Sequence, residues 1–153
     1  MKMMTMNVKT IFAAFATAVL ATAGCQHKAT PMDYDAEIRK CDSIIAHCYA
    51  EFEHAASSNR CNGLSFELLE ALEAKDSLLW LRLMDRCAGD EKLFMYQQFQ
   101  YDRTLYRMLC DRNDSISYHQ DIEDPWWLVN SNSDKIDWME RHIRILQQHT
   151  REQ

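Results

Sequence analysis

The 153-residue sequence has few of the residues that interrupt helices, with only three glycines and two prolines in the whole chain. Glycine and proline mark most tight turns, and an all-β sandwich needs many turns between its short strands. Their scarcity argues against such a sandwich and favours a small number of long helices.

Motifs that carry known chemistry are also missing. The chain has no glycine-rich phosphate-binding loop, no G-x-S-x-G motif and no C-x-x-C pair, which would indicate nucleotide binding, a nucleophilic serine and a zinc site respectively. We therefore expect a protein that is not an enzyme and that holds neither a cofactor nor a metal.

Acidic residues outnumber basic residues beyond the first ten residues. The chain carries 17 basic and 23 acidic residues, a net charge of −6, and Lys2 and Lys9 account for two of the basic residues. Without them the net charge falls from −6 to −8. Such an acidic chain lacks the positive surface needed for nucleic acids and favours cationic partners.

The first 24 residues have the pattern of a signal peptide. Lys2 and Lys9 precede the uncharged stretch 11–23, which is shorter than the roughly 20 residues that span a bilayer, and small residues follow. The tetrapeptide T-A-G-C at 22–25 resembles the lipobox of bacterial lipoproteins, although Thr22 stands where an aliphatic residue is usual. The resemblance implies cleavage before Cys25 and a lipid on its sulfur.

A lipid on Cys25 would anchor the protein to a membrane of the cell envelope, facing the periplasm or the exterior. The alternative is cleavage after Ala23, at the A-T-A sequence, which would release a soluble periplasmic or secreted protein. In the first interpretation the chain divides into a signal peptide (1–24), a lipidated cysteine and tether (25–32) and a single helical domain (33–153).

Within that domain the apolar spacing predicts an all-α, antiparallel bundle of about four helices. The first helix is expected over 33–57, followed by a loop over 57–63. A second helix, capped by Ser65, should end near Cys87. Its S-L-L-W-L-R-L-M sequence is apolar on nearly every side, as in the most buried helix of a domain or in a contact surface.

A third helix is expected from Asp90 to about residue 110, where polar residues begin. An irregular segment with two tryptophans should follow, because Pro125 interrupts regular structure. The polar tract 130–134 should then lead, through a Ser133 cap, into a last helix over 134–149.

Five cysteines follow the proposed lipid site. Cys41 and Cys48 share a helix face but lie about 10 Å apart along it, beyond the roughly 7 Å Cα limit for a disulfide. Antiparallel neighbours would bring Cys41 towards Cys87 and Cys61 towards Cys110, and would leave Cys48 as a buried thiol. The alternative is that all five are reduced, buried, apolar side chains.

The histidines offer only weak metal motifs. His47, Glu51 and His54 share one helical face, and Glu51 with His54 matches the Glu-x-x-His of di-iron bundles. No second copy of that motif occurs, so a solvated polar face is favoured. His142 and His149 lie seven residues apart, too far to chelate one ion alone, and are expected at the surface.

The segment 119–127 is the most distinctive local cluster. It combines His119 with carboxylates and tryptophans, namely Asp121, Glu123, Asp124, Trp126 and Trp127. Such groups together suit glycan binding or cleavage, and they define a candidate binding patch for a protein or a glycan. The alternatives are that a tryptophan closes one end of the bundle while the acids face water, or that the segment serves a metal-dependent or glycan-acting enzyme.

The third helix is rich in aromatic residues. Tyr96, Phe99, Tyr101 and Tyr106 spread around more than one of its faces. We expect core packing with outward tyrosine hydroxyls, and an aromatic partner surface is the alternative.

A second resemblance concerns the domain itself. Trp80 precedes Cys87 by about two turns, and Arg141 to Leu146 form a late helical stretch. This arrangement resembles the lysozyme-inhibitor-like family of envelope lipoproteins, which implies inhibition of a cationic enzyme such as lysozyme. The main expectation from the sequence is a lipid-anchored envelope protein that acts as a non-catalytic binding or structural module.

Overall fold

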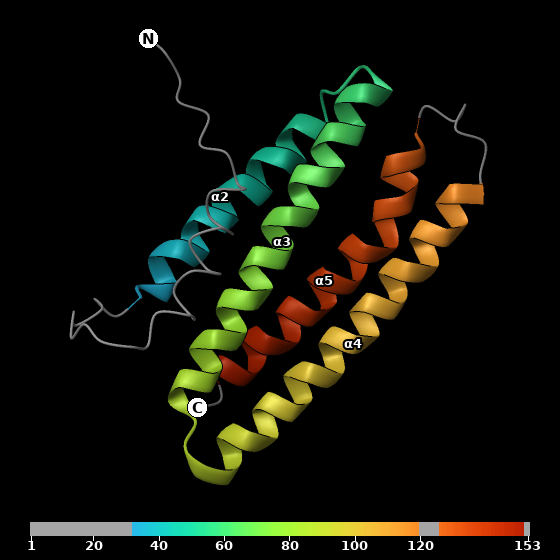
Figure 1. Cartoon of the computed structure of the whole chain (residues 1–153). Coiled ribbons are helices and arrows are strands. Elements are labelled where there is room, and N and C mark those ends of the chain that lie inside the picture. The colour runs from blue at the N-terminus through green and yellow to red at the C-terminus, as the bar shows by residue number, and fades with distance from the viewer. Residues whose placement is uncertain (1–31, 120–125, 152–153) are drawn as a thin grey trace, which may run out of the picture. The chain divides into compact units, whose positions relative to one another are not determined.

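The computed structural model describes residues 32–119 and 126–151. Four helices make up most of these two ranges, and neither contains a strand. They are α2 (Tyr34–Phe52), α3 (Ser58–Arg86), α4 (Gly89–His119) and α5 (Trp127–Arg151). Successive helices run in opposite directions (Figure 1), so the predicted all-α antiparallel bundle is confirmed.

Helix α2 begins where its sequence provides a cap. The Asp33 carboxylate accepts a hydrogen bond from the backbone N–H of Ala36 at 3.0 Å, and acidic residues in the first turn suit the positive helix end. The helix face that carries Cys41 and Cys48 points inward, and both residues are buried together with Ile38. The helix ends at Phe52, five residues before the predicted end at 57.

Helix α3 starts earlier than the sequence suggested, and the predicted loop over 57–63 is wrong. Ser57 is the true cap, and its hydroxyl accepts a hydrogen bond from the backbone N–H of Arg60 at 3.3 Å. Ser65, the predicted cap, is buried inside the helix and donates to the carbonyl of Asn62 at 2.8 Å. Packing in the bundle outweighs the poor helix propensity of the S-S-N-R-C-N-G sequence.

The turn between α3 and α4 depends on Gly89. Cys87 is extended, and Gly89 has a φ of +56°, the only positive φ in the described residues. This left-handed conformation is strained for residues that have a Cβ atom. The turn reverses the chain within two residues, and α4 then continues to His119, well beyond the predicted end near residue 110.

Helix α5 also begins earlier than predicted, because the polar tract 130–134 is helical. Ser133 therefore lies inside the helix and is not its cap. The tract finds polar partners on the neighbouring helices: Asn132 Nδ2 donates to Ser65 Oγ at 3.2 Å, and Asn113 Nδ2 donates to the Ser131 carbonyl at 3.3 Å. Since these groups are satisfied on burial, the tract can pack against the core as a helix.

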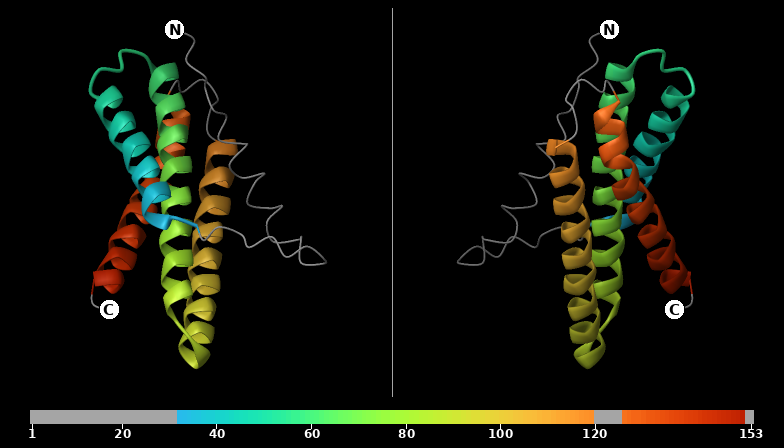
Figure 2. Two further views of the ribbon diagram at one scale, coloured as in Figure 1. Left: turned by 90° about the vertical axis from the view of Figure 1, so that its left-hand side faces the viewer. Right: turned by 90° about the vertical axis from the view of Figure 1, so that its right-hand side faces the viewer.

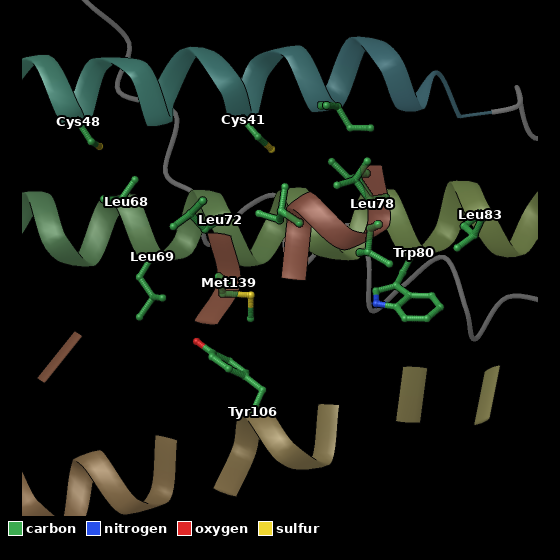
Figure 3. Close-up of a cluster of buried hydrophobic side chains, with 14 of the residues drawn as sticks. Cys41, Cys48, Leu68, Leu69, Leu72, Leu78, Trp80, Leu83, Tyr106 and Met139 are labelled. Carbon is green, nitrogen blue, oxygen red and sulfur yellow. The ribbon is translucent and has the colours of Figure 1, made fainter. Parts of the chain in front are cut away.

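Helix α3 is central to the packing. It packs extensively against both α2 and α5, whereas α4 packs mainly against α5 and only slightly against α3. Figures 1 and 2 show α2 and α4 on opposite sides of the α3–α5 pair. In Figure 3, Cys41 and Cys48 point from α2 towards α3, and Tyr106 points from α4 towards Met139 of α5. The side chains that are less than 2 % exposed come mostly from α3, and the largest apolar ones are Leu64, Leu68, Leu79, Leu83, Met139 and Leu146.

The predicted disulfides are absent, since the five cysteines of the described residues are all free thiols. On the α2–α3 side, Lys75 pairs with Asp42 and Arg82 pairs with Asp35, each at 2.6 Å. This register places Cys41 level with about residue 76 of α3, so Cys87 lies roughly 16 Å further along the helix axis.

The second predicted disulfide fails for the same reason. Arg103 donates to Ser77 at 2.6 Å and Tyr106 donates to Glu73 at 2.5 Å, which sets the register of α4 on α3. Cys110 is then level with about residue 70, roughly 13 Å along the axis from Cys61. Helix α3 begins before Cys61 and α4 continues past Cys110, so neither of these cysteines lies at the helix end where the sequence placed it.

Candidate functional site

The segment singled out in the sequence lies mostly outside the described residues. The structure does not describe residues 120–125, which include Asp121, Glu123, Asp124 and Pro125. Trp126 precedes α5 and is 43 % exposed, and Trp127 is the first residue of α5. The proposed binding patch over 119–127 therefore remains a hypothesis from the sequence.

The weak metal motif on α2 is not assembled. Glu51 instead accepts a hydrogen bond from Arg60 at 2.8 Å, and this bond lowers the pKa of the Glu51 carboxyl. His54 lies in the turn after α2, so it no longer follows the helical spacing from His47. Within residues 32–119 and 126–151, no group of three or more histidine, cysteine, aspartate or glutamate side chains is placed to hold a metal.

His142 is buried, which corrects the prediction that it is a surface residue. Its ring Nδ1 lies 2.5 Å from Asp76 Oδ1, and Nε2 lies 3.2 Å from Asp102 Oδ2. Asp76 comes from α3, Asp102 from α4 and His142 from α5. His149, the other histidine of the predicted pair, is exposed as expected.

The electrostatics of this buried cluster favour a charged imidazole. Burial alone would lower the pKa of His142, but hydrogen bonds and charge interactions with Asp76 and then Asp102 outweigh burial and raise it. The ring stacks on Trp138, with centroids 4.7 Å apart, and lies 6.0 Å from Trp80. Faces of tryptophan rings also favour a nearby cation.

The cluster connects three helices, and each imidazole nitrogen of His142 is paired with a carboxylate. Asp76 is only 1 % exposed, and a general base needs a nitrogen within reach of a substrate proton. We therefore interpret the Asp76–His142–Asp102 cluster as a structural link among α3, α4 and α5. It fixes how α4 is oriented on the bundle.

Other polar contacts attach α4 to α3 beside this cluster. The Tyr106 hydroxyl donates to Glu73, and Arg103 donates to the hydroxyl of Ser77. Burial, followed by the bond to Glu73, raises the pKa of Tyr106. The inner side of α4 is thus joined to α3 by hydrogen bonds and by the contact between the Phe99 and Trp80 rings, whose centroids lie 5.2 Å apart.

The outer side of α4 carries a row of exposed apolar side chains, which we call the α4 outer face. It consists of Phe94, Tyr101, Leu105 and Met108, which are 64 %, 60 %, 39 % and 64 % exposed. Their spacings of 7, 4 and 3 residues place them within about 60° of one another around the helix. This face points away from Tyr106, the buried aromatic residue of the same helix.

The α4 outer face agrees in part with the sequence analysis. Of the four aromatic residues named there, Tyr106 is buried, Phe99 is half-buried, and Tyr96 and Tyr101 are exposed. Phe94, Leu105 and Met108 were missed. The seven-residue repeat of Phe94, Tyr101 and Met108 was the available signal, because this repeat is typical of helices that pair with another helix.

None of the described helices is both long enough and apolar enough to cross a membrane.

Comparisons with known proteins add no family to this description. No protein-family model matches the chain, and neither the curated proteins nor the solved structures give a significant match.

Proposed function

We propose that this protein is a lipid-anchored, non-catalytic binding module of the cell envelope, held to a membrane through Cys25. The α4 outer face is the observation that carries the binding role. Four large apolar side chains in one row on a single helix are costly to leave in water. Surfaces of this kind mark sites of protein–protein contact.

Support for the anchor comes from the T-A-G-C sequence at 22–25 and the preceding uncharged stretch. The test is the intact mass of the protein from the membrane fraction of its own host. A chain that starts at Cys25 and carries acyl groups is expected. In addition, five thiols should react after unfolding without reductant, because the five cysteines after Cys25 are free.

The matched variant for the anchor is Cys25→Ser, whose intact mass should show no acyl groups. Wild-type protein that starts at Gly24 without a lipid would contradict the anchor and leave a soluble envelope protein.

The binding role is tested with a photo-crosslinking amino acid at position 101 in the full-length chain, in native membranes. Position 66 is the control, because Phe66 is an aromatic residue of α3 that is 52 % exposed but lies outside the α4 outer face. We expect intermolecular adducts from position 101 and not from position 66. Equal yields, or no adduct from either position, would contradict the binding role.

Acidity favours a second candidate function, inhibition of a cationic enzyme such as lysozyme. The net charge of −8 after residue 24 would attract such an enzyme electrostatically. Binding should then weaken steeply as salt is added, because the Debye length falls from about 10 Å at 0.1 M to about 3 Å at 1 M salt. Lysozyme activity that is unchanged by excess protein at low salt would eliminate this candidate.

A further inference from the structure

We propose that the partner of the α4 outer face is a second copy of this chain, with the two α4 helices packed antiparallel. This inference rests on the proposed binding role of that face and names its occupant. It is carried by three observations: the position of α4 in the bundle, the spacing of its exposed side chains and the charges at its two ends.

The position of α4 allows a second helix to approach. Helix α4 lies on the outside of the bundle, and its contacts are with α5 and, to a small extent, α3 (Figures 1 and 2). Its outer face is turned away from both. A helix of 31 residues offers about 45 Å of length for side-by-side pairing.

The spacing of the exposed side chains suits a helical pair with a two-fold axis. Phe94 and Met108 lie the same distance, seven residues, on either side of Tyr101. In an antiparallel pair centred on Tyr101, the two Tyr101 rings meet each other and each Phe94 meets Met108 of the other copy. The two patches are then self-complementary, as a symmetric dimer requires, and the paired rings gain from aromatic contact.

The charges at the two ends select the antiparallel orientation. Asp90 and Glu91 are exposed in the first turn of α4, and Arg112 is exposed near its other end. Asp90 and Arg112 each lie eleven residues from Tyr101 and on the same side of the helix as the outer face. An antiparallel pair therefore places Arg112 of one copy beside Asp90 and Glu91 of the other.

A parallel pair would instead bring Asp90 against Asp90 and Arg112 against Arg112, which is repulsive at both ends. Within its own chain Arg112 lies 3.4 Å from Asp134, and both side chains are more than half exposed. Such an exposed pair is weak, so it leaves the guanidinium available for a carboxylate of the second copy.

Disulfide trapping with the full-length chain in mild detergent tests the pairing and its orientation. Tyr101→Cys should form a covalent dimer, because position 101 meets itself on the two-fold axis. Phe94→Cys alone should not, since the two copies of position 94 would lie roughly 21 Å apart along the helices. Mixing Phe94→Cys protein with Met108→Cys protein should restore the dimer.

Unmodified protein is the background control, because it contains the same native thiols. No dimer from Tyr101→Cys would overturn the proposal, as would self-crosslinking of Phe94→Cys, which indicates a parallel pair. Adducts at position 101 with a different protein would overturn this inference but leave the binding role intact. Loss of the anchor in the Cys25→Ser variant would leave the crosslinking pattern unchanged.

Two substitutions measure the strength of the pairing by analytical ultracentrifugation. Tyr101→Glu places two carboxylates against each other and should raise the dimer dissociation constant by about tenfold or more. Phe66→Glu, the control outside the face, should leave that constant unchanged. Asp90→Arg should weaken the dimer, and Asp90→Arg combined with Arg112→Asp should restore it; no restoration would contradict the antiparallel charge pairing.

Discussion

Helices α3 and α4 have nearly the same length, 29 and 31 residues, but they differ in how many of their apolar side chains are buried. Helix α3 turns its leucines towards two neighbours and supplies most of the fully buried side chains. Helix α4 has Tyr106 as its buried aromatic residue and keeps Phe94, Tyr101 and Met108 largely in water. Apolar content alone therefore does not identify the core, because the number of neighbours that a helix has determines which of its faces are buried.

The largest expected difference between the two helices comes from truncating a leucine in each. Leu79 of α3 is 1 % exposed, so Leu79→Ala should lower the free energy of unfolding by about 3 kcal/mol, through lost apolar contact and a new cavity. Leu105→Ala in α4 should cost less than about 1 kcal/mol at low protein concentration, because water already reaches that side chain. Urea denaturation of both variants measures the contrast, and equal losses would contradict it.

A buried carboxylate of α3, Asp76, links the two helices through His142 of α5. Asp76→Ala leaves His142 without its closest partner, and removal of one member of a buried pair costs about 3 kcal/mol. The control is Asp42→Ala, which removes a half-exposed carboxylate that pairs with Lys75 and should cost less than about 1 kcal/mol. If the two variants lose the same free energy of unfolding in urea, the buried cluster does not hold α4 in place.

The same cluster makes stability depend on pH. The pKa of His142 in the folded protein is raised above its ordinary value of 6.5. Its contribution to stability is therefore complete below about pH 6.5 and is lost as the pH rises through the folded-state pKa. Urea denaturation between pH 5.5 and 8.5 should show this decline.

Two variants identify the group responsible for that decline. His142→Gln should remove it, and His149→Gln, at an exposed histidine of the same helix, should keep it. Stability that rises through this pH range in the wild-type protein would contradict the proposed charge on His142.

The smallest expected effect lies in the turn that joins α3 to α4. Gly89 has a φ of +56° and has open space around it, so Gly89→Ala should cost about 1 kcal/mol through backbone strain alone. Gly63, inside α3, also has open space around it. Gly63→Ala should raise the free energy of unfolding by about 0.5–1 kcal/mol, because alanine favours the helical conformation. Urea denaturation should show that Gly89→Ala lowers the free energy of unfolding and that Gly63→Ala raises it. Changes of the same sign in both variants would contradict the assigned turn.

The helical class could be predicted because it follows from local patterns. The spacings of 3 and 7 residues between Ile38, Cys41 and Cys48 identified the inner face of α2, and Gly89 identified the end of α3. These signals act within one or two turns of the chain. They do not depend on where the other helices lie.

Helix starts were less predictable, because polar residues favour loops in isolation. Ser65 and Asn132 resemble loop or cap residues, but in the bundle they bond to each other across the α3–α5 contact. The burial of His142 was missed for a related reason. Its partners Asp76 and Asp102 lie 66 and 40 residues away, and no local pattern brings the three together.

The α4 outer face was visible in the sequence only through Tyr101. Tyr101 and Tyr106 were recognised as aromatic residues of this helix, but they could not be assigned to opposite sides without knowing which neighbours α4 has. That knowledge comes from the packing of α4 against α5 and, weakly, α3. An exposed face is a property of the assembled bundle and cannot be derived from one helix alone.

The most direct test of the division of roles between α3 and α4 is the midpoint of urea unfolding as a function of protein concentration. It is measured for the wild-type chain and for the triple variant Phe94→Ser, Tyr101→Ser and Met108→Ser. The wild-type midpoint should rise with concentration, because a dimer stabilises the fold by mass action. The midpoint of the triple variant should stay constant and meet the wild-type value at high dilution. The contradicting result has two parts: the wild-type midpoint does not change with concentration, and the triple variant is less stable than the wild type at every dilution. That result would show that the α4 outer face supports the fold of a single chain and is not a surface for a partner.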